Sequence, residues 1–210
     1  MDLSHHAVSV FDKRAEDYQA KFMDLSLYHE SFDFFCKLLK PQSELLELAC
    51  GPGNITKYIL EKRPDLKILA TDLSPRMIEL AKINNPTADV ALLDVRKICN
   101  LDRKFDAILC GFGLPYLSKE DATSLILDTA KSLNPGGIFY LSTMEGDYAK
   151  SGPKKSSDGK DEIFIFFHQA DYLSEALLVE GFQINMLKRQ EFPEADGSKT
   201  TDLIIIAQMA

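Results

Sequence analysis

An apolar segment at residues 45–49 leads directly into a turn that contains Gly51 and Gly53, and a helix-forming segment follows. Glycine has no side chain and adopts left-handed backbone conformations, so such a turn lets the main chain approach a ligand closely. Asp72 ends the next apolar run, 19 residues after Gly53. A carboxylate at this separation is typical of proteins that bind the two hydroxyls of a ribose. The pattern predicts a nucleoside-containing ligand.

The residues after this turn disfavour two phosphate-binding motifs. A P-loop has Lys followed by Ser or Thr after its last glycine, whereas Gly53 is followed by Asn54 and Ile55. The dinucleotide motif Gly-x-Gly-x-x-Gly places a third glycine where this chain has Thr56. The other alternative is a turn that joins a strand to a helix and binds nothing.

Size and charge limit the function classes. The chain has 210 residues, 45% of them hydrophobic, and a net charge of −8. This length supports the core of one domain, and we expect a single domain over residues 1–210. An acidic chain lacks the clustered Lys and Arg on which nucleic-acid affinity depends. No apolar run approaches the length of a membrane span, about 18 residues or more. We expect neither a nucleic-acid nor a membrane partner, and the oligomeric state is open.

Cysteine and histidine spacing gives no indication of a metal site. The four cysteines show no Cys-x-x-Cys spacing, and the four histidines form no cluster of potential ligands. A metal site needs such a cluster. The expected state of the thiols is reduced and structural, in a cytoplasmic protein without a signal sequence.

Strand-like and helix-like segments alternate over residues 44–142 with short connections. This order indicates an α/β fold, with a parallel sheet covered by helices on both faces. Ser74 and Pro75 supply a helix N-cap and a proline at the first helical position. The predicted strands are 44–49, 67–71, 89–93, 105–110 and 137–142, and the predicted helical segments are 54–63, 75–84, 95–98 and 119–133.

The last third of the chain changes character. Residues 171–180 predict a helix, and residues 182–189 and 201–207 predict two strands. Asp196 and Gly197, in a polar loop between those strands, are typical of a hairpin connection. An antiparallel pair therefore completes the otherwise parallel sheet.

Two segments lie outside this core. Residues 1–43 have the three- and four-residue apolar spacing of amphipathic helices, with Phe11 and Tyr18 among the apolar positions. Residues 146–162 are polar, partly basic and rich in Gly, Ser and Pro. This composition predicts a mobile loop, either a solvated connector or a lid over an active site.

With these elements placed, residues from about 40 to 207 resemble the class I S-adenosylmethionine-dependent methyltransferases. The segment ELACGPG at residues 47–53 is similar to the family's first motif, in which an acidic residue ends the first strand before a glycine turn. Glu47 stands where Asp is commoner, and Ala49 stands where Gly is usual. The methyl group of Ala49 is a small intrusion on the turn.

Five further segments match the family in order. They are ATDLSPRMIELAK around Asp72, ALLDVRK around Asp94, FDAILC at 105–110, LNPGG at 133–137 and EGF at 180–182. The resemblance implies a Rossmann-like seven-stranded sheet in the order 3-2-1-4-5-7-6, with the last strand antiparallel. It also implies an N-terminal helical lid over 1–43 and a core over 44–210.

The resemblance places the cofactor, S-adenosylmethionine, over the carboxyl ends of the first four strands. Asp72 corresponds to the ribose-binding acid, and Asp94 to the carboxylate that accepts from the adenine amino group. Glu47 suits the cationic sulfonium or the amino group of the cofactor. Asp72 and Asp94 each have an alternative interpretation as helix N-caps. The complete predicted set is Glu47, Ala49, Cys50, Gly51, Pro52, Gly53, Asp72, Leu73, Met77, Asp94, Val95, Cys110 and Gly111.

The family implies in-line attack of an acceptor on the methyl carbon, to which the protein contributes mainly alignment and water exclusion. A general base is optional and depends on the acceptor. The catalytic candidates are Tyr116, His168 and Tyr18, followed by Tyr28 and Tyr148, and each is also explained as a packing or surface residue.

The acidic charge favours a small-molecule acceptor, as does the resemblance of residues 10–22 to the lid helices of small-molecule methyltransferases. Two other functions are considered. One is a non-catalytic module that binds S-adenosylmethionine or S-adenosylhomocysteine. The other is an NAD(P)-dependent oxidoreductase, which Thr56 and the closing hairpin disfavour.

Overall fold

A seven-stranded β-sheet forms the centre of the computed structural model, which describes residues 2–155, 159–193 and 197–210. The strand order is β3-β2-β1-β4-β5-β9-β8, and β9 alone runs against the other strands of this sheet. Because β6 and β7 form a separate sheet, β8 and β9 are the sixth and seventh strands here, and the predicted order is confirmed. The strands are β1 (Glu44–Leu48), β2 (Lys67–Asp72), β3 (Asp89–Leu92), β4 (Phe105–Gly111), β5 (Leu133–Glu145), β8 (Phe182–Pro193) and β9 (Lys199–Met209).

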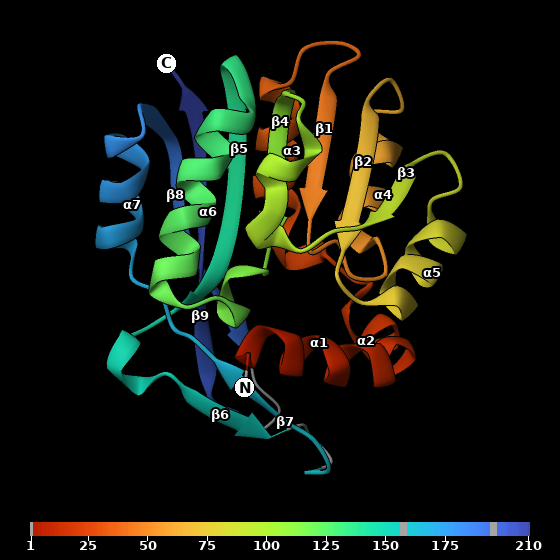
Figure 1. Cartoon of the computed structure of the whole chain (residues 1–210), viewed down its shortest axis with the longest axis vertical. Helices are drawn as coiled ribbons and strands as arrows, with labels where there is room; N and C mark the ends of the chain where they lie inside the picture. Colours follow the sequence, from red (N-terminus) through yellow and green to blue (C-terminus); the bar gives the residue numbers. More distant parts are fainter. Residues whose placement is uncertain (1, 156–158, 194–196) are drawn as a thin grey trace.

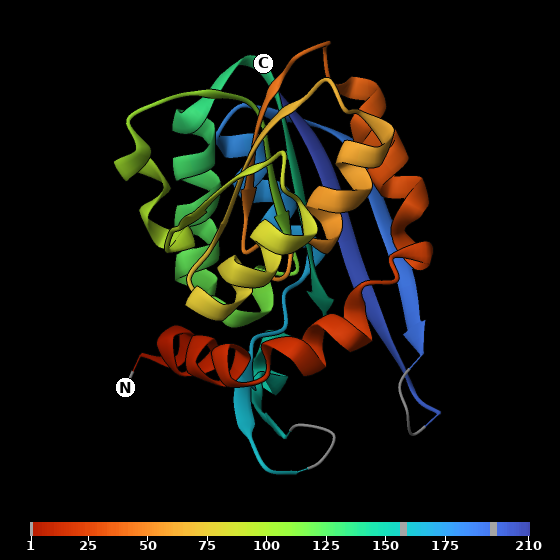
Figure 2. The same ribbon diagram turned by 90° about the vertical axis from the view of Figure 1, so that its right-hand side faces the viewer.

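Helices cover both faces of the sheet, which gives the molecule three layers (Figures 1 and 2). Adjacent residues of β1 show the division, since Leu45 packs with the α3–α4 side and Leu46 with the α6–α7 side. Burial on both faces explains why the central strands are continuous apolar runs. One layer contains α3 (His29–Leu38), α4 (Asn54–Lys62) and α5 (Pro75–Asn84), and the other contains η2 (Val95–Leu101), α6 (Lys119–Ser132) and α7 (Ala170–Val179).

The N-terminal segment divides between two roles. Helices α1 (Leu3–Lys13) and α2 (Ala15–Phe22) cross the carboxyl edge of the sheet, at the bottom of Figure 1. The short helix η1 (Ser26–Tyr28) leads into α3, whose Phe32 and Phe35 are fully buried against the sheet. Only the first part of the expected lid therefore covers the edge, because the aromatic face of α3 has a place in the core.

The segment expected as a loop at 146–162 contains regular structure. The helix η4 (Tyr148–Lys150) is followed by a hairpin of β6 (Gly152–Lys155) and β7 (Glu162–Ile165). The apolar run that begins in β7 supplies the reason, because Ile165 is buried and Phe166 N donates to Pro115 O (2.8 Å). Residues 156–158, within this expected loop, and Asp196, within the predicted hairpin connection, lie outside the described residues.

The turn between β1 and α4 requires glycine at position 53. Gly53 has φ +79°, and a Cβ there would lie 2.2 Å from Asn85 Nδ2 and 3.3 Å from the Ala81 backbone. We predict that Gly53→Ala lowers the free energy of unfolding by about 2–4 kcal/mol, since a left-handed residue and local overpacking each cost about 1–3 kcal/mol.

Urea unfolding of both proteins measures this effect. Gly152→Ala is the matched control, because a Cβ at Gly152 meets nothing within 4 Å. Equal stabilities of Gly53→Ala and Gly152→Ala would contradict the prediction.

Candidate active site

Asp72 ties together the turns that follow β1 and β2. Gly51 N donates to Asp72 Oδ2 (2.9 Å), and Ser74 N donates to Asp72 Oδ1 (2.9 Å). The N-cap of α5 is Ser74, so Asp72 has a different role from helix capping. Burial raises the pKa of Asp72, and these backbone donors oppose the shift. The carboxylate is therefore held at the carboxyl edge between two adjacent parallel strands.

Strained backbone lies next to this carboxylate. Ala49 and Phe112 have φ of 52° and 58°, a region that costs residues with a side chain about 1–2 kcal/mol. A Cβ at Gly113 would lie 3.1 Å from the Ala49 Cβ and 2.8 Å from Cys110 Sγ. The ends of β1 and β4 are thus packed closely, with backbone strain of the kind that clusters at functional sites.

Glu47 is a fully buried acid on β1 with one side-chain partner. Thr56 Oγ1 donates to Glu47 Oε2 (2.5 Å), while Oε1 has no partner in the described part of the chain. Burial raises the pKa of Glu47 to about 8, and the negative charge of Asp72 contributes to the increase. An unsatisfied buried oxygen costs about 1–3 kcal/mol, so Oε1 lowers the stability of the folded protein.

A cavity lies at this edge of the sheet, between the strand ends and helices α1 and α2. Eight residues of the predicted cofactor set line it: Ala49, Gly51, Asp72, Leu73, Met77, Asp94, Val95 and Gly111. Tyr18 and Tyr116 line it as well. The sequence analysis did not assign Ser4, Ala7, Val8, Phe11, Phe112, Gly113 and Leu117 to the site. Among these, Phe11 had a usable signal, because its helical spacing from Tyr18 places both side chains on one face.

The other five members of the predicted set lie behind the cavity wall: Glu47, Cys50, Pro52, Gly53 and Cys110. Gly53 faces α5 rather than the cavity. Both thiols are buried, and burial raises the pKa of Cys110 to about 12 and that of Cys50 in the same direction. These cysteines are therefore protonated packing groups.

Asp94 is held by Arg96. The Arg96 guanidinium donates to both oxygens of Asp94, and Arg96 N donates to Asp94 Oδ1 (3.0 Å). Asp94 is also the N-cap of η2, so the capping interpretation applies to this residue. Hydrogen bonds and the positive charge of Arg96 keep the pKa of Asp94 below its usual value, against the opposing effect of burial.

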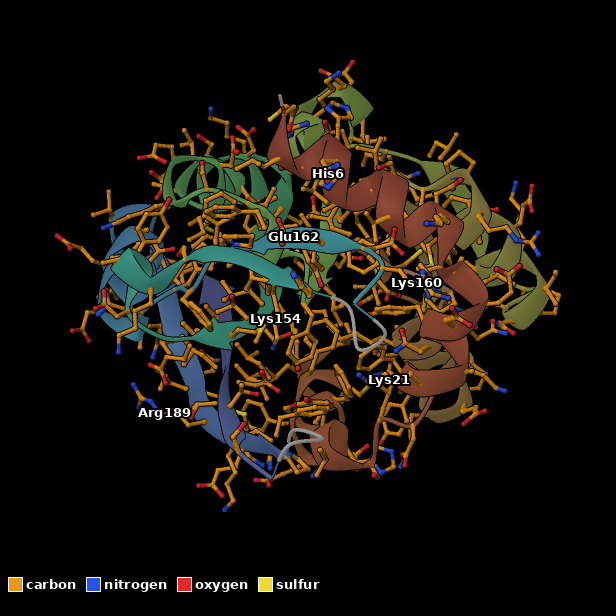
Figure 3. The ribbon with its side chains drawn as sticks, turned by 90° about the horizontal axis from the view of Figure 1, so that it is seen from below. His6, Lys21, Lys154, Lys160, Glu162 and Arg189 are labelled. Carbon is orange, nitrogen blue, oxygen red and sulfur yellow. The ribbon has the colours of Figure 1, made fainter. Side chains whose placement is uncertain are left out.

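Helices α1 and α2 are attached to both sides of the cavity. On one side, Asp12 Oδ1 accepts from Ser74 Oγ (2.7 Å) and Arg76 N (2.9 Å) at the start of α5. On the other side, His6 Nε2 lies 2.9 Å from Glu162 O in β7, and Figure 3 shows this hairpin running beside α1. The enclosed space is about 100 Å³, below the roughly 300–1,000 Å³ of typical ligand pockets.

His168 and Tyr28 are two of the catalytic candidates, and both lie outside the cavity lining. His168 is buried, with Nε2 2.9 Å from Leu114 O and Nδ1 in contact with the Tyr172 hydroxyl. Burial lowers the pKa of His168, which favours a neutral ring with both nitrogens engaged. Tyr28 donates to Asp202 (2.6 Å) and contacts the ring of Phe112.

The third candidate outside the lining is Tyr148, whose hydroxyl accepts from Lys119 N (3.2 Å) at the start of α6. These contacts give the three residues structural partners, and the cavity itself contains only Tyr18 and Tyr116 from the candidate set.

Comparison with known proteins matches the part of the chain that contains most of this site. Residues 45–137 match a family model described as a methyltransferase domain, and this interval contains the β1 turn, Asp72, Asp94 and the end of β4. The matched interval is that of a methyltransferase domain, and the chain is similar to the class I S-adenosylmethionine-dependent methyltransferase family. S-adenosylmethionine is the cofactor of that family.

Two curated relatives of this protein are malonyl-[acyl-carrier protein] O-methyltransferases. The one from Priestia megaterium is 30% identical over 183 residues, covering 83% of this chain and 64% of the relative. The one from Acetivibrio thermocellus is 29% identical over 106 residues, 50% of this chain and 36% of the relative. A tRNA N(3)-methylcytidine methyltransferase of Schizosaccharomyces pombe is 28% identical over 170 residues, 69% and 66% of the two chains. The chain thus spans about one to two thirds of these relatives' lengths.

Solved structures show the same fold at low identity. A DhpI–S-adenosylhomocysteine complex superposes with a TM-score of 0.74 at 18% identity, covering 100% of this chain and 98% of the other. A methyltransferase from Methanosarcina mazei has a TM-score of 0.72 at 18% identity, covering 84% and 96%. Within the described residues, no helix is long and apolar enough to cross a membrane, and no group of three or more His, Cys, Asp or Glu could hold a metal ion.

The buried Glu47 makes stability depend on pH. The folded protein keeps the Glu47 proton up to about pH 8, whereas the unfolded chain releases it near the ordinary glutamate pKa of 4.5. Folding therefore takes up a proton between these values, and stability falls as the pH rises through this interval. We predict a contribution from Glu47 of about −1.4 kcal/mol per pH unit to the free energy of unfolding.

Urea unfolding across this interval isolates the contribution when wild type is compared with Glu47→Gln, which keeps an acceptor for Thr56 Oγ1. The variant is expected to lose that part of the slope. Glu44→Gln, at the half-buried start of the same strand, is expected to keep that slope. Parallel curves for wild type and Glu47→Gln would contradict the prediction.

Proposed function

We propose that this protein transfers a methyl group from S-adenosylmethionine to a small-molecule acceptor. The observation that most directly supports this proposal is the cavity at the carboxyl edge of the sheet, where Asp72 and the Gly51 turn adjoin Gly111 at the end of β4. The strand order of the sheet reverses between the neighbouring strands β1 and β4. In open α/β sheets, ligands bind in the crevice at such a point.

The residues around the cavity are suited to three parts of this cofactor, which are the ribose, the adenine and the cationic methionine part. Asp72, Leu73 and Met77 line the cavity, where Asp72 would receive the ribose hydroxyls and the two apolar side chains would contact the adenine. Asp94 would share its oxygens between Arg96 and the adenine amino group. The unpaired Oε1 of Glu47 suits the cationic part of the cofactor, because a nearby positive charge favours the ionised carboxylate.

The protein's contribution to the reaction is alignment and exclusion of water. S-adenosylmethionine supplies a methyl group that its positive sulfur has already activated. The aromatic side chains of Phe11 and Phe112 cover the cavity from α1 and from the end of β4. Fixing the two reactants in line within such an enclosure contributes up to about 7–11 kcal/mol in well-oriented systems.

A small acceptor is supported by the enclosure and the charge. The lid is attached through Asp12 to α5 and through His6 to β7, so it covers part of the cavity. The net charge of −8 disfavours a nucleic-acid substrate. The relatives act on an acyl-carrier protein or on tRNA, so the acceptor class of this chain belongs to the proposal. The four free thiols agree with a reducing compartment such as the cytoplasm.

Two alternatives make different demands on the site. A nicotinamide-dependent oxidoreductase would place a pyrophosphate at the α4 N-terminus, where Thr56 occupies the third-glycine position and donates to Glu47. A non-catalytic module would bind the cofactor and leave no space for an acceptor beside Gly111.

Asp72 offers the sharpest test of cofactor binding. We predict that Asp72→Asn raises the Kd for S-adenosylhomocysteine about 5- to 150-fold, because lost hydrogen bonds to a charged group are worth about 1–3 kcal/mol. Asparagine preserves the shape of the Asp72 side chain. It keeps one acceptor oxygen, which serves the Gly51 amide or the Ser74 amide. Isothermal titration calorimetry measures the affinity.

The matched control is Asp89→Asn at the exposed start of β3, which is expected to bind as wild type does. An unchanged affinity in a folded Asp72→Asn protein would limit Asp72 to a structural role.

A further inference from the structure

Two tyrosine hydroxyls in the cavity have no hydrogen-bond partner among the described residues. Tyr18 comes from α2, and Tyr116 comes from η3 (Leu114–Tyr116), which follows β4. Both side chains are partly exposed within the cavity, and a tyrosine hydroxyl that leaves water usually finds a partner. The other five tyrosines follow this rule, and their partners are Asp202 for Tyr28, Asp33 for Tyr58, Ser31 for Tyr140, Lys119 for Tyr148 and His168 for Tyr172. The unpaired hydroxyls are therefore those that face the cavity.

The two tyrosines are held in place as one aromatic group. The ring of Phe11 contacts both edge-on, with centroid separations of 5.6 Å to Tyr18 and 4.9 Å to Tyr116. Burial raises the pKa of Tyr18 to about 12, and it raises the pKa of Tyr116 as well. Both hydroxyls are thus protonated near neutral pH and act as donors. Their ligand must supply an oxygen or nitrogen lone pair.

Among the described residues, the cavity lining contains no ionisable acid or base beyond those that the proposed function assigns to the cofactor. Asp72 is assigned there to the ribose hydroxyls, and Asp94 is shared between Arg96 and the adenine amino group. His168 lies outside the lining with both ring nitrogens engaged. Asp202 accepts from Tyr28, which packs behind Phe112. Methylation of a hydroxyl or an amine releases a proton and would need such a base or solvent.

We propose, building on the methyltransferase function, that the acceptor is a carboxylate held by the hydroxyls of Tyr18 and Tyr116 and converted to its methyl ester. A carboxylate has about four lone-pair sites, so two donors leave others free to react. One oxygen lone pair forms a bond to the methyl carbon, the carbon–sulfur bond breaks, and its electron pair stays on sulfur. No proton is released, which matches the absence of a base in the lining.

The side chains that line the cavity favour a carboxylate over a phosphate as the acceptor. Phosphate groups are generally bound by Arg or Lys, and neither residue type lines the described cavity. The charged side chains of the described lining are Asp72 and Asp94, which the proposed function assigns to the cofactor, so the positive sulfur of the bound cofactor would compensate the single negative charge of the acceptor. The Phe11 and Phe112 rings favour an acceptor whose carboxylate is attached to an apolar body.

The test combines an acceptor panel with two tyrosine variants. Benzoate, phenylacetate and hexanoate are compared with benzylamine, phenethylamine, hexylamine and the corresponding alcohols in the full chain with S-adenosylmethionine. Release of S-adenosylhomocysteine is measured by chromatography, and proton release is measured with a pH indicator. We expect turnover in the carboxylate series without proton release.

With the best carboxylate, Tyr116→Phe and Tyr18→Phe are expected to lower kcat/KM about ten- to hundredfold, the effect of a lost hydrogen bond to a charged group. The Kd for S-adenosylhomocysteine should stay within about twofold of wild type in both. Tyr148→Phe removes a hydroxyl outside the cavity and should change neither quantity.

Three results would overturn the proposal. They are turnover restricted to amines or alcohols, no turnover of any carboxylate by a protein that binds S-adenosylhomocysteine, and tyrosine variants that lose cofactor affinity instead of acceptor turnover. The last result would assign the hydroxyls to the cofactor's own carboxylate. A protein that binds no S-adenosylhomocysteine at all would refute the methyltransferase function itself, and calorimetry distinguishes that case.

Discussion

The pairing of Asp72 with the Gly51 amide is the interaction on which the rest of the site depends. It joins the turn after β1 to the end of β2, and Asp72 also receives the Ser74 amide at the start of α5. From α5, Ser74 and Arg76 hold Asp12 of the lid. One carboxylate thus connects two strand ends, a helix start and, through Ser74, the cover of the cavity. A ribose bound there would meet a group that is already oriented.

Glu47 and the strained residues show that this edge is not optimised for stability. A buried carboxyl with an unpaired oxygen lies beside Asp72, and left-handed conformations occur at Ala49 and Phe112. Each feature is unfavourable in the absence of a ligand. Their concentration at the carboxyl edge is understandable if a cationic, hydroxyl-bearing ligand satisfies them. The fully buried faces of the sheet stabilise the fold around this edge.

The sequence predicted the structural features that local patterns determine. It missed the features that depend on contacts between distant segments of the chain. Strand order and the Gly51–Asp72 arrangement follow from the turn, the acid and the alternation of elements. The contribution of Phe112 and Gly113 to the cavity follows from a turn after β4 that carries no motif. The engagement of Asp94 by Arg96 depends on a rotamer choice that spacing does not encode. The β6–β7 hairpin was obscured by the lysines and glycines around it, although its apolar run is strand-sized.

The most direct measurement is thermal unfolding of the full chain with S-adenosylmethionine, S-adenosylhomocysteine, NAD or NADP added separately. A ligand at about 100 times its Kd adds about 2.7 kcal/mol of stability, which a melting curve resolves. The account predicts that only the two sulfur nucleosides raise the melting temperature. Stabilisation by NAD or NADP alone, or by none of the four, would contradict the assignment of this cavity to S-adenosylmethionine.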